Sequence, residues 1–259
     1  MTDSTKTETP SVAAGGAQKA HTGLTTRKDN WWLEPALVAC GFTLFIVYAT
    51  FRVFENGHYE IGSYLSPFYS PKFAFDWWKF SPAILILWIP AGFRATCYYY
   101  RKAYYRAYFW DPPGCSIGHM GGHNYTGETK FPFVFQNAHR YFFYLASIVL
   151  IFLWYDVYLA FFQPTGFVVS GINLFMLLNV VLLSGYSGGC HACRHLVGGR
   201  LDCFSKCEST KQQFKIWHLV TKLNEHHMLW AWLSLFSVGL TDLLIRSYEL
   251  GYVPEMRFF

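Results

Sequence analysis

The residues best suited to chemistry gather in one short segment, which reads Cys-His-Ala-Cys-Arg-His from residue 190 to residue 195. If a helix runs through it, Cys190 and Cys193 share one face at a spacing of three residues. His191 and His195 then share the neighbouring face at a spacing of four. Cys and His in equal measure are typical of tetrahedral zinc, or of a Rieske-type two-iron cluster with Cys on one iron and His on the other.

A cluster of this kind needs more ligands than one helix can easily provide. Cys115 follows a Pro-Pro-Gly loop and Cys97 ends an apolar stretch, so we expect at least one further ligand from these two. Four ligands would come from a predicted pool of Cys190, His191, Cys193, His195, Cys115 and Cys97. The alternative is a set of interfacial thiols and hydrogen-bonded imidazoles without a metal. Cys203 and Cys207 could complete a zinc site, but their wider spacing favours free loop thiols.

The histidines allow a different redox centre, haem b, as an alternative to the cluster. Haem b held between two helices needs one His from each helix at matching depth. The candidates for such a site are His139, His191, His195 and His227. No apolar stretch has a His in its middle or outer half, so a second, deeper haem is not expected.

Residues 94–110 carry six tyrosines and four basic residues in alternation with other aromatic and small residues. Such a belt is typical of a membrane interface, where it anchors the protein. We also interpret it as a docking surface with a quinone pocket, in which a polar side chain binds a carbonyl oxygen and delivers a proton. The predicted quinone-binding residues are His139, Arg140, Tyr105, Arg101 and His227. Each of them taken alone is more often a snorkelling or capping residue.

The composition is that of a membrane protein. Of 259 residues, 53% are apolar, 20% are aromatic and only 14% are charged, against about 25% charged in an ordinary soluble domain. This excludes a disordered chain. The net charge of +5 does not indicate a nucleic-acid partner, because the basic residues flank long apolar runs and form no single patch. Residues 1–30 lack the apolar core of a cleavable signal peptide.

Five stretches are long and apolar enough to span a bilayer, which takes about 20 residues. They are Trp31 to Phe51, Ser81 to Tyr100, Tyr141 to Phe162, Gly166 to Tyr186 and Met228 to Ile245. The predicted fold is an all-α integral membrane bundle of five transmembrane helices over residues 31–259, preceded by a mobile tail over residues 1–30.

Basic residues orient this bundle. By our assignment of the loops, 16 of the 21 Lys and Arg residues lie on the side of the N-terminus, which is predicted to be cytoplasmic with the C-terminus outside. Six of the seven cysteines and eight of the ten histidines lie at or beyond the helix ends on this side, and the other two histidines are His21 in the tail and His58 in the outer loop. Because that compartment is reducing, the clustering favours metal ligation over disulfides.

Several motifs together resemble a known family. They are Arg94 to Trp110, Thr126-Gly127-Glu128, Gln136 to Tyr144, Cys190 to Gly199 and Leu223 to Met228. Across roughly residues 30–259 the chain resembles the membrane-anchor subunit of actinobacterial-type succinate dehydrogenase, the succinate:menaquinone oxidoreductase also called complex II.

The resemblance implies an anchor in the plasma membrane that binds a flavoprotein subunit and an iron-sulfur subunit on its cytoplasmic face and passes electrons to menaquinone. Many relatives in the wider group bind two haems through four histidines, and this sequence departs from that pattern. We therefore predict a relay through a Cys/His-bound [2Fe–2S] cluster, with no succinate site on this chain. The alternatives are the same role with a single haem b, or a non-redox membrane adaptor with structural zinc. The sequence leaves open a higher oligomer and the direction of the reaction.

Overall fold

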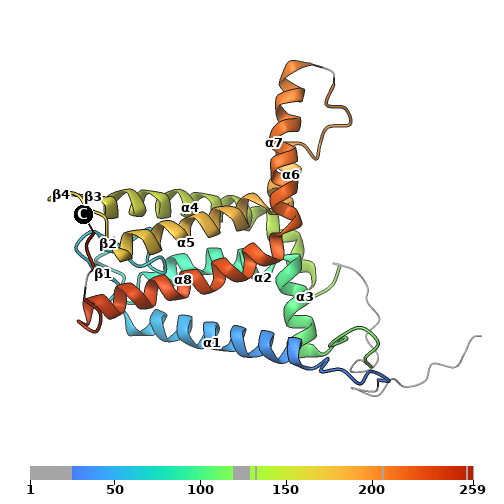
Figure 1. Ribbon diagram of the computed structural model, residues 1–259, viewed down its shortest axis with the longest axis horizontal. Helices are drawn as coiled ribbons and strands as arrows, with labels where there is room; N and C mark the ends of the chain where they lie inside the picture. Colours follow the sequence, from blue (N-terminus) through green and yellow to red (C-terminus); the bar gives the residue numbers. More distant parts are fainter. Residues whose placement is uncertain (1–24, 119–128, 132, 206, 255, 259) are drawn as a thin grey trace, which may run out of the picture.

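The computed structural model describes residues 25–118, 129–131, 133–205, 207–254 and 256–258. Most of the predicted tail and the Thr126-Gly127-Glu128 motif therefore lie outside the described residues. Five helices run side by side along the long axis of the molecule (Figure 1). Their bounds are Leu33–Glu55 for α1, Ala83–Ala95 for α2, His139–Phe161 for α4, Gly171–Gly188 for α5 and His227–Glu249 for α8.

Shorter elements mark the two ends of this bundle. At one end, which we call the junction end, α3, α6 and α7 run crosswise to the five helices (Figure 1). The elements here are α3 (Tyr98–Tyr104), a π-helical turn η1 (Tyr105–Phe109), a 3-10 helix η2 (Phe133–Ala138), α6 (His191–Val197) and α7 (Glu208–Glu225). The other end, the hairpin end, carries two antiparallel two-stranded ladders. These are β1 (Glu60–Ile61) with β2 (Tyr64–Leu65), and β3 (Phe162–Gln163) with β4 (Gly166–Phe167).

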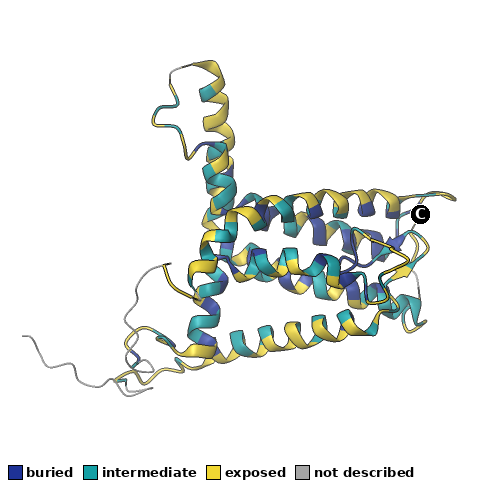
Figure 2. Cartoon of the chain, turned by 180° about the vertical axis from the view of Figure 1, so that it is seen from behind, coloured by how far each residue is buried: buried dark blue, intermediate teal, exposed yellow. Residues whose placement is uncertain are grey.

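Four helices, α1, α4, α5 and α8, are long and apolar enough to cross a membrane. Large apolar side chains on their outer faces are exposed, as lipid contact requires, while the buried residues lie between helices (Figure 2). Inside the bundle, Val157, Val180 and Ile245 pack α4, α5 and α8 together. The prediction of four of the five long apolar helices is confirmed at this level.

The stretch predicted to span from Ser81 to Tyr100 is not one helix. Helix α2 has 13 residues, about 20 Å at 1.5 Å per residue, which is shorter than the roughly 30 Å of a hydrocarbon core. At its end the Thr96 hydroxyl donates to the carbonyl of Gly92 at 2.7 Å, and Cys97 then adopts an extended conformation. The chain turns there into α3.

Helix α5 begins later than the predicted Gly166. Gly166 has φ of +125°, a conformation that favours glycine, and it turns the chain between β3 and β4. The helix starts at Gly171, after Ser170, whose side chain accepts from the backbone N–H of Asn173 while Asn173 reaches back to Ser170. This capping box sets the helix start, which the apolar pattern alone does not show.

A buried ion pair joins α1 to α8 near the hairpin end. Arg52 donates through Nε to the carboxylate of Asp242 at 2.7 Å, and both side chains are fully buried. Of the residues of α1, only Pro35 and Arg52 are buried. This pair is therefore the main buried attachment of α1 to the rest of the bundle.

Candidate metal centre

Four breaks between helices meet at the junction end. The chain is extended at Cys97, between α2 and α3, and again at Cys190, between α5 and α6. Each cysteine is the N-cap of the short helix that follows it. His139 is the first residue of α4 and His227 the first residue of α8. Side chains from distant parts of the sequence are thereby directed to one place.

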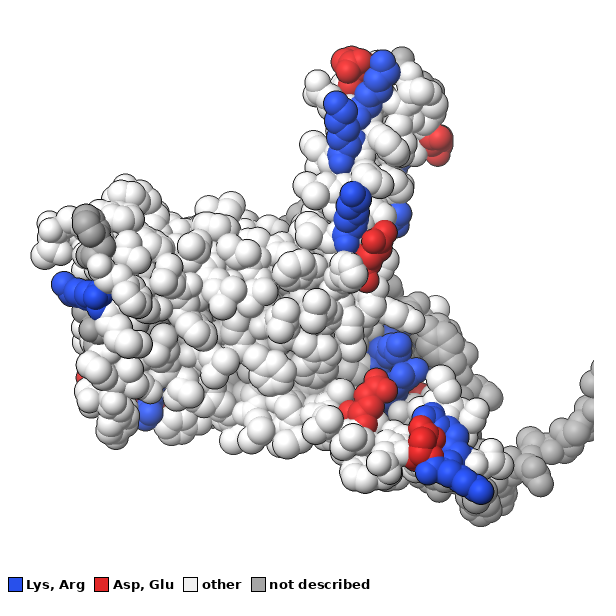
Figure 3. Space-filling view, viewed as in Figure 1, with Lys and Arg blue, Asp and Glu red and all other residues white. Residues whose placement is uncertain are grey.

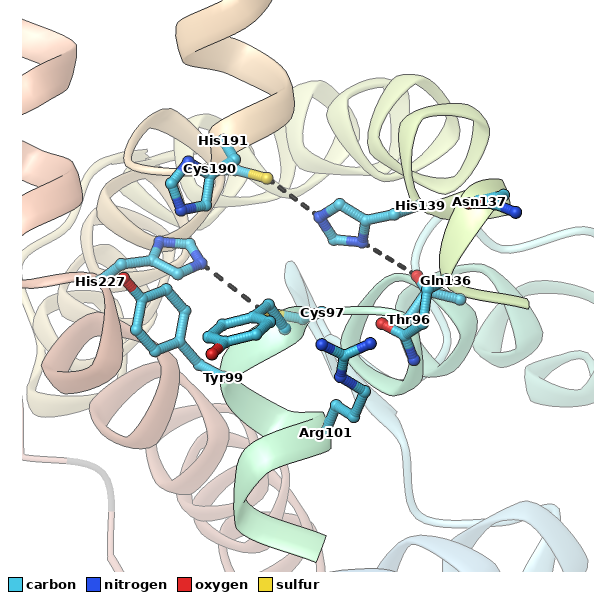
Figure 4. Close-up of a pocket in the computed structure, with 11 residues that line it drawn as sticks. Thr96, Cys97, Tyr99, Arg101, Gln136, Asn137, His139, Cys190, His191 and His227 are labelled. Carbon is cyan, nitrogen blue, oxygen red and sulfur yellow. Dashed lines mark hydrogen bonds between the residues drawn. The ribbon is translucent and has the colours of Figure 1, made fainter. Parts of the chain in front are cut away.

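These side chains surround a pocket of about 250 Å³ (Figure 4). Its lining consists of Thr96, Cys97, Tyr98, Tyr99, Arg101, Gln136, Asn137, His139, Cys190, His191 and His227. Cys97, Cys190 and His227 are buried and form its floor. Tyr98, Asn137 and His191 are exposed, so the pocket has a rim open to the surroundings. Two thiols and three imidazoles thus share one cavity.

The donors form two Cys/His pairs on facing walls (Figure 4). The Sγ atom of Cys97 lies 3.7 Å from Nε2 of His227. The Sγ atom of Cys190 lies 3.1 Å from Nε2 of His139, whose Nδ1 is 2.9 Å from the Thr96 hydroxyl. Among the described residues, no three Cys, His, Asp or Glu side chains come close enough together to hold one metal ion. The donors therefore surround a cavity and do not converge on a single point.

Aromatic rings hold the imidazoles in place. The ring of His139 stacks on Phe93 with centroids 5.0 Å apart, and that of His227 stacks on Tyr186 at 5.0 Å. Tyr99 contacts His227 from the other side at 5.1 Å. The Nδ1 atom of His227 is buried and has no hydrogen-bond partner among the described residues. An unpartnered buried nitrogen of this kind is costly in an apolar site, so it needs an explanation.

Burial favours the uncharged forms of the two pocket thiols and of His191. It raises the pKa of the Cys190 thiol to about 12 and also raises the pKa of Cys97. Burial, with the charge of Arg194, lowers the pKa of His191. Near neutral pH these thiols are protonated and this imidazole is neutral. A metal must displace the thiol protons on binding, whereas the imidazole needs no deprotonation.

Three members of the predicted ligand pool line the pocket, namely Cys97, Cys190 and His191. The other three do not. Cys193 is half-buried and packs against the aromatic core beside the pocket. The Nδ1 atom of His195 lies 3.4 Å from the guanidinium of Arg140. Cys115 is exposed, and its carbonyl accepts from Arg27.

The expectation of two chelating faces depends on one helix running through residues 190–195, and the structure meets this condition only in part. His191, Cys193 and His195 lie on α6, whereas Cys190 is its extended N-cap. Helix α5 ends at Gly188 and α6 begins at His191. Gly188 and Gly189 pack closely on Leu223, and a Cβ at Gly189 would lie 2.9 Å from the carbonyl oxygen of Gly185. The glycines let two helix ends approach, and of the two cysteines in this segment only Cys190 lines the pocket.

The predicted quinone-binding residues divide in a similar way. Arg101, His139 and His227 line the pocket. Tyr105 lies next to it and stacks on Phe133 with centroids 5.1 Å apart. Arg140 points away, towards His195.

Sequence reasoning missed two features of this site. It did not pair His139 and His227 with cysteines, and it did not single out Thr96 as a partner of His139. His139 belongs to the motif from Gln136 to Tyr144. This motif was the sequence feature from which the His139 side of the pocket could have been predicted. Cys203 and Cys207 lie in the segment that leads into the outer end of α7, away from the bundle (Figure 1).

Comparison with known proteins gives two matches. The family described as actinobacterial succinate dehydrogenase subunit SdhC matches residues 33–251. A chain of the Mycobacterium smegmatis Sdh1 complex in the apo form has a similar structure, with a TM-score of 0.81 and 39% sequence identity. That match covers 91% of this chain and 94% of the other. No curated protein sequence gives a significant match. The chain belongs to the actinobacterial SdhC family: it is a multi-pass membrane-anchor subunit of a succinate dehydrogenase complex in the plasma membrane.

Proposed function

We propose that this anchor passes electrons from the iron-sulfur subunit to menaquinone through a Rieske-type [2Fe–2S] cluster held in the junction-end pocket. The observation that carries the proposal is the pocket itself: two buried thiols and three imidazoles line about 250 Å³, in two Cys/His pairs on facing walls. Donors arranged around a cavity fit a cluster of several atoms better than a single zinc ion, which needs four ligands within bonding distance of one point.

Cys97, Cys190 and two of the three imidazoles would hold the cluster. Two Cys and two His are the donors of Rieske-type ligation, although each wall of this pocket carries one of each kind. His139 is the better placed of the imidazoles, because its Nδ1 already has a partner in Thr96 and its Nε2 faces the cavity. His227 has a nitrogen without a partner, which a ligand would satisfy. The cluster, when bound, supplies a one-electron carrier at a potential raised by His ligation relative to all-Cys ligation.

Menaquinone would bind beside this pocket, against Arg101 and Tyr105. The guanidinium of Arg101 lies 5.9 Å from the ring centroid of Phe133, and the ring of Tyr105 stacks on that of Phe133 with centroids 5.1 Å apart. Arg101 also lines the pocket, so it lies between the cluster donors and this aromatic surface. A guanidinium and a phenol are suitable donors to the carbonyl oxygens of a quinone.

In the proposed topology the chain crosses the membrane five times. Helix α2 is too short to cross alone, so the coil that precedes it supplies the rest of that crossing. The junction end faces the cytoplasm, because the basic residues gather there (Figure 3). The flavoprotein and iron-sulfur subunits then dock on the face that carries the pocket rim, with Tyr98, Asn137 and His191 exposed there. This places the electron donor next to the cluster.

The test is spectroscopy of the purified intact complex with single-residue variants of this subunit. We expect the wild type to show a reduced [2Fe–2S] EPR signal of the His-ligated type, in addition to the signals of the iron-sulfur subunit. Cys97→Ser and Cys190→Ser should each remove it and lower the iron content. Cys193→Ser is the matched control, because Cys193 lies near the pocket but does not line it.

An unchanged signal in both pocket variants would overturn the proposal. So would haem b absorption bands without the extra signal, which would assign His139, His191 or His227 as axial ligands. Zinc without additional iron would leave an adaptor with no electron carrier.

A further inference from the structure

Helix α7 stands apart from the rest of the bundle. It runs crosswise to the spanning helices and projects sideways from the junction end (Figure 1). In a multi-pass protein the spanning helices lie along the membrane normal, so a crosswise helix at their ends lies along the membrane surface. Its 18 residues extend it by about 27 Å.

The base of α7 is fixed firmly enough to hold this direction. Asn224 donates to the carbonyl of Gly189 at 2.7 Å. Arg194 of α6 donates to the Thr221 hydroxyl at 3.0 Å, and its guanidinium lies 4.6 Å from the ring centroid of Trp217. These contacts tie α7 to both α5 and α6, so its exposed faces have a set orientation.

Most of the outer part of α7 is exposed, and two neighbouring faces of it differ in chemistry. Lys211, Lys215 and Lys222 follow one another at spacings of four and seven residues, which places them in one row along the helix. Figure 3 shows basic side chains in such a row over the length of α7. Ile216 and Leu219, on the adjacent face, are 53% and 59% exposed.

Two of these lysines have no carboxylate partner among the residues that the structure describes. Lys211 pairs with Glu208 at 3.1 Å. Lys215 and Lys222 form no ion pair within the part of the chain that the structure describes. A basic row beside an exposed apolar row is the pattern of helices that lie in a membrane interface.

We propose that α7 is a membrane-surface arm whose lysines bind the headgroups of anionic phospholipids. Ile216 and Leu219 enter the boundary of the acyl chains, while Lys215 and Lys222 reach the phosphates. Charge complementarity and the crosswise direction favour a lipid surface over a protein partner. The inference does not depend on the cofactor in the pocket.

The test is hydrogen–deuterium exchange of residues 208–225 in the complete complex, reconstituted in nanodiscs of phosphatidylcholine with or without phosphatidylglycerol. Each lysine near an anionic surface contributes about fivefold in affinity. Phosphatidylglycerol should therefore slow exchange in the wild type by up to roughly 25-fold, and Lys215→Gln/Lys222→Gln should remove this effect. Lys28→Gln/Lys130→Gln is the matched control, because it removes the same charge from elsewhere in the chain.

Unaltered exchange of the lysine variant in pure phosphatidylcholine would show that α7 still folds. The proposal is overturned if phosphatidylglycerol slows the wild type and the α7 variant equally, or slows neither. It is also overturned if protection is the same in both lipids and disappears on removal of the other subunits. That result would assign α7 to a protein interface.

Discussion

The buried pair of Arg52 and Asp242 allows a quantitative prediction of stability. Asp242 accepts from Arg52 Nε at 2.7 Å, from Arg52 Nη2 at 3.3 Å and from the Tyr48 hydroxyl at 2.5 Å. The Ser66 hydroxyl donates to the same carboxylate. Asp242→Asn keeps the side-chain volume but removes the negative charge. The amide N–H groups of the asparagine then face the donors of Arg52, Tyr48 and Ser66, which need an acceptor. The variant leaves the arginine buried without its main counter-ion.

The size of the effect follows from what Arg52 retains. Breaking a buried ion pair by changing one partner typically costs about 3–5 kcal/mol. Arg52 still donates to the carbonyls of Gly57 and His58, each at 3.0 Å, and to Glu55. We therefore expect the lower limit, about 3 kcal/mol, which corresponds to a fall in Tm of roughly 6–12 °C for a chain of this size.

The fall in Tm of Asp242→Asn can be measured by thermal unfolding of the purified subunit or complex, followed with a thiol-reactive dye. Lys72→Gln is the control, because the Lys72–Glu60 pair is partly exposed and such pairs contribute at most about 1 kcal/mol. Arg52→Met/Asp242→Leu should recover most of the loss, since removing both charges leaves no buried ion unpaired. An Asp242→Asn variant that melts like the wild type, or a double variant less stable than the single one, would refute the reasoning.

Two further predictions concern the pocket and the thiols. Thr96→Val removes the hydroxyl that lies 2.9 Å from Nδ1 of His139, so the midpoint potential of the extra EPR signal should shift. Thr96→Ser keeps the hydroxyl and should have the wild-type potential. Equal potentials for the two variants would show that this contact does not determine the potential. In iron-free protein near neutral pH, iodoacetamide should modify Cys207 before Cys190, as measured by mass spectrometry. Backbone and side-chain hydrogen bonds from Thr210 lower the pKa of the exposed Cys207 thiol, whereas burial raises that of Cys190 to about 12. The rate at Cys190 should then rise about tenfold per pH unit up to that value, and a pH-independent rate would contradict the assignment.

Apolar content predicted most of the fold because membrane-spanning helices must satisfy their own backbone and face lipid. The predicted stretch Trp31 to Phe51 corresponds to α1, and Met228 to Ile245 corresponds to α8, with ends displaced by a few residues. The break at Cys97 was not predictable in this way, because apolar and aromatic residues continue through it. There Cys97 leaves the helical conformation and contacts His227, a residue distant in sequence.

The candidate site was predicted less well than the fold. Helical spacing was extended through Gly188 and Gly189, although paired glycines are a signal for a helix end. The cysteine-to-histidine pairs join residues 130 and 51 positions apart in the chain, and no local pattern encodes such contacts. The sequence therefore predicted that Cys and His side chains gather at one end of the bundle. Which cysteine lies next to which histidine depends on helix packing and is seen only in the structure.

The helix breaks also determine the electrostatics of the pocket. The helices α4 and α8 both begin at a pocket imidazole, so their positive N-terminal ends lie at the cavity. The helices α2 and α5 end two residues before Cys97 and Cys190, so their negative C-terminal ends lie at the same cavity. These opposite helix ends offset one another. The helix dipoles therefore do not distinguish an electron carrier from a structural zinc site, and the proposed cluster depends on the donor set and on its spread around the cavity.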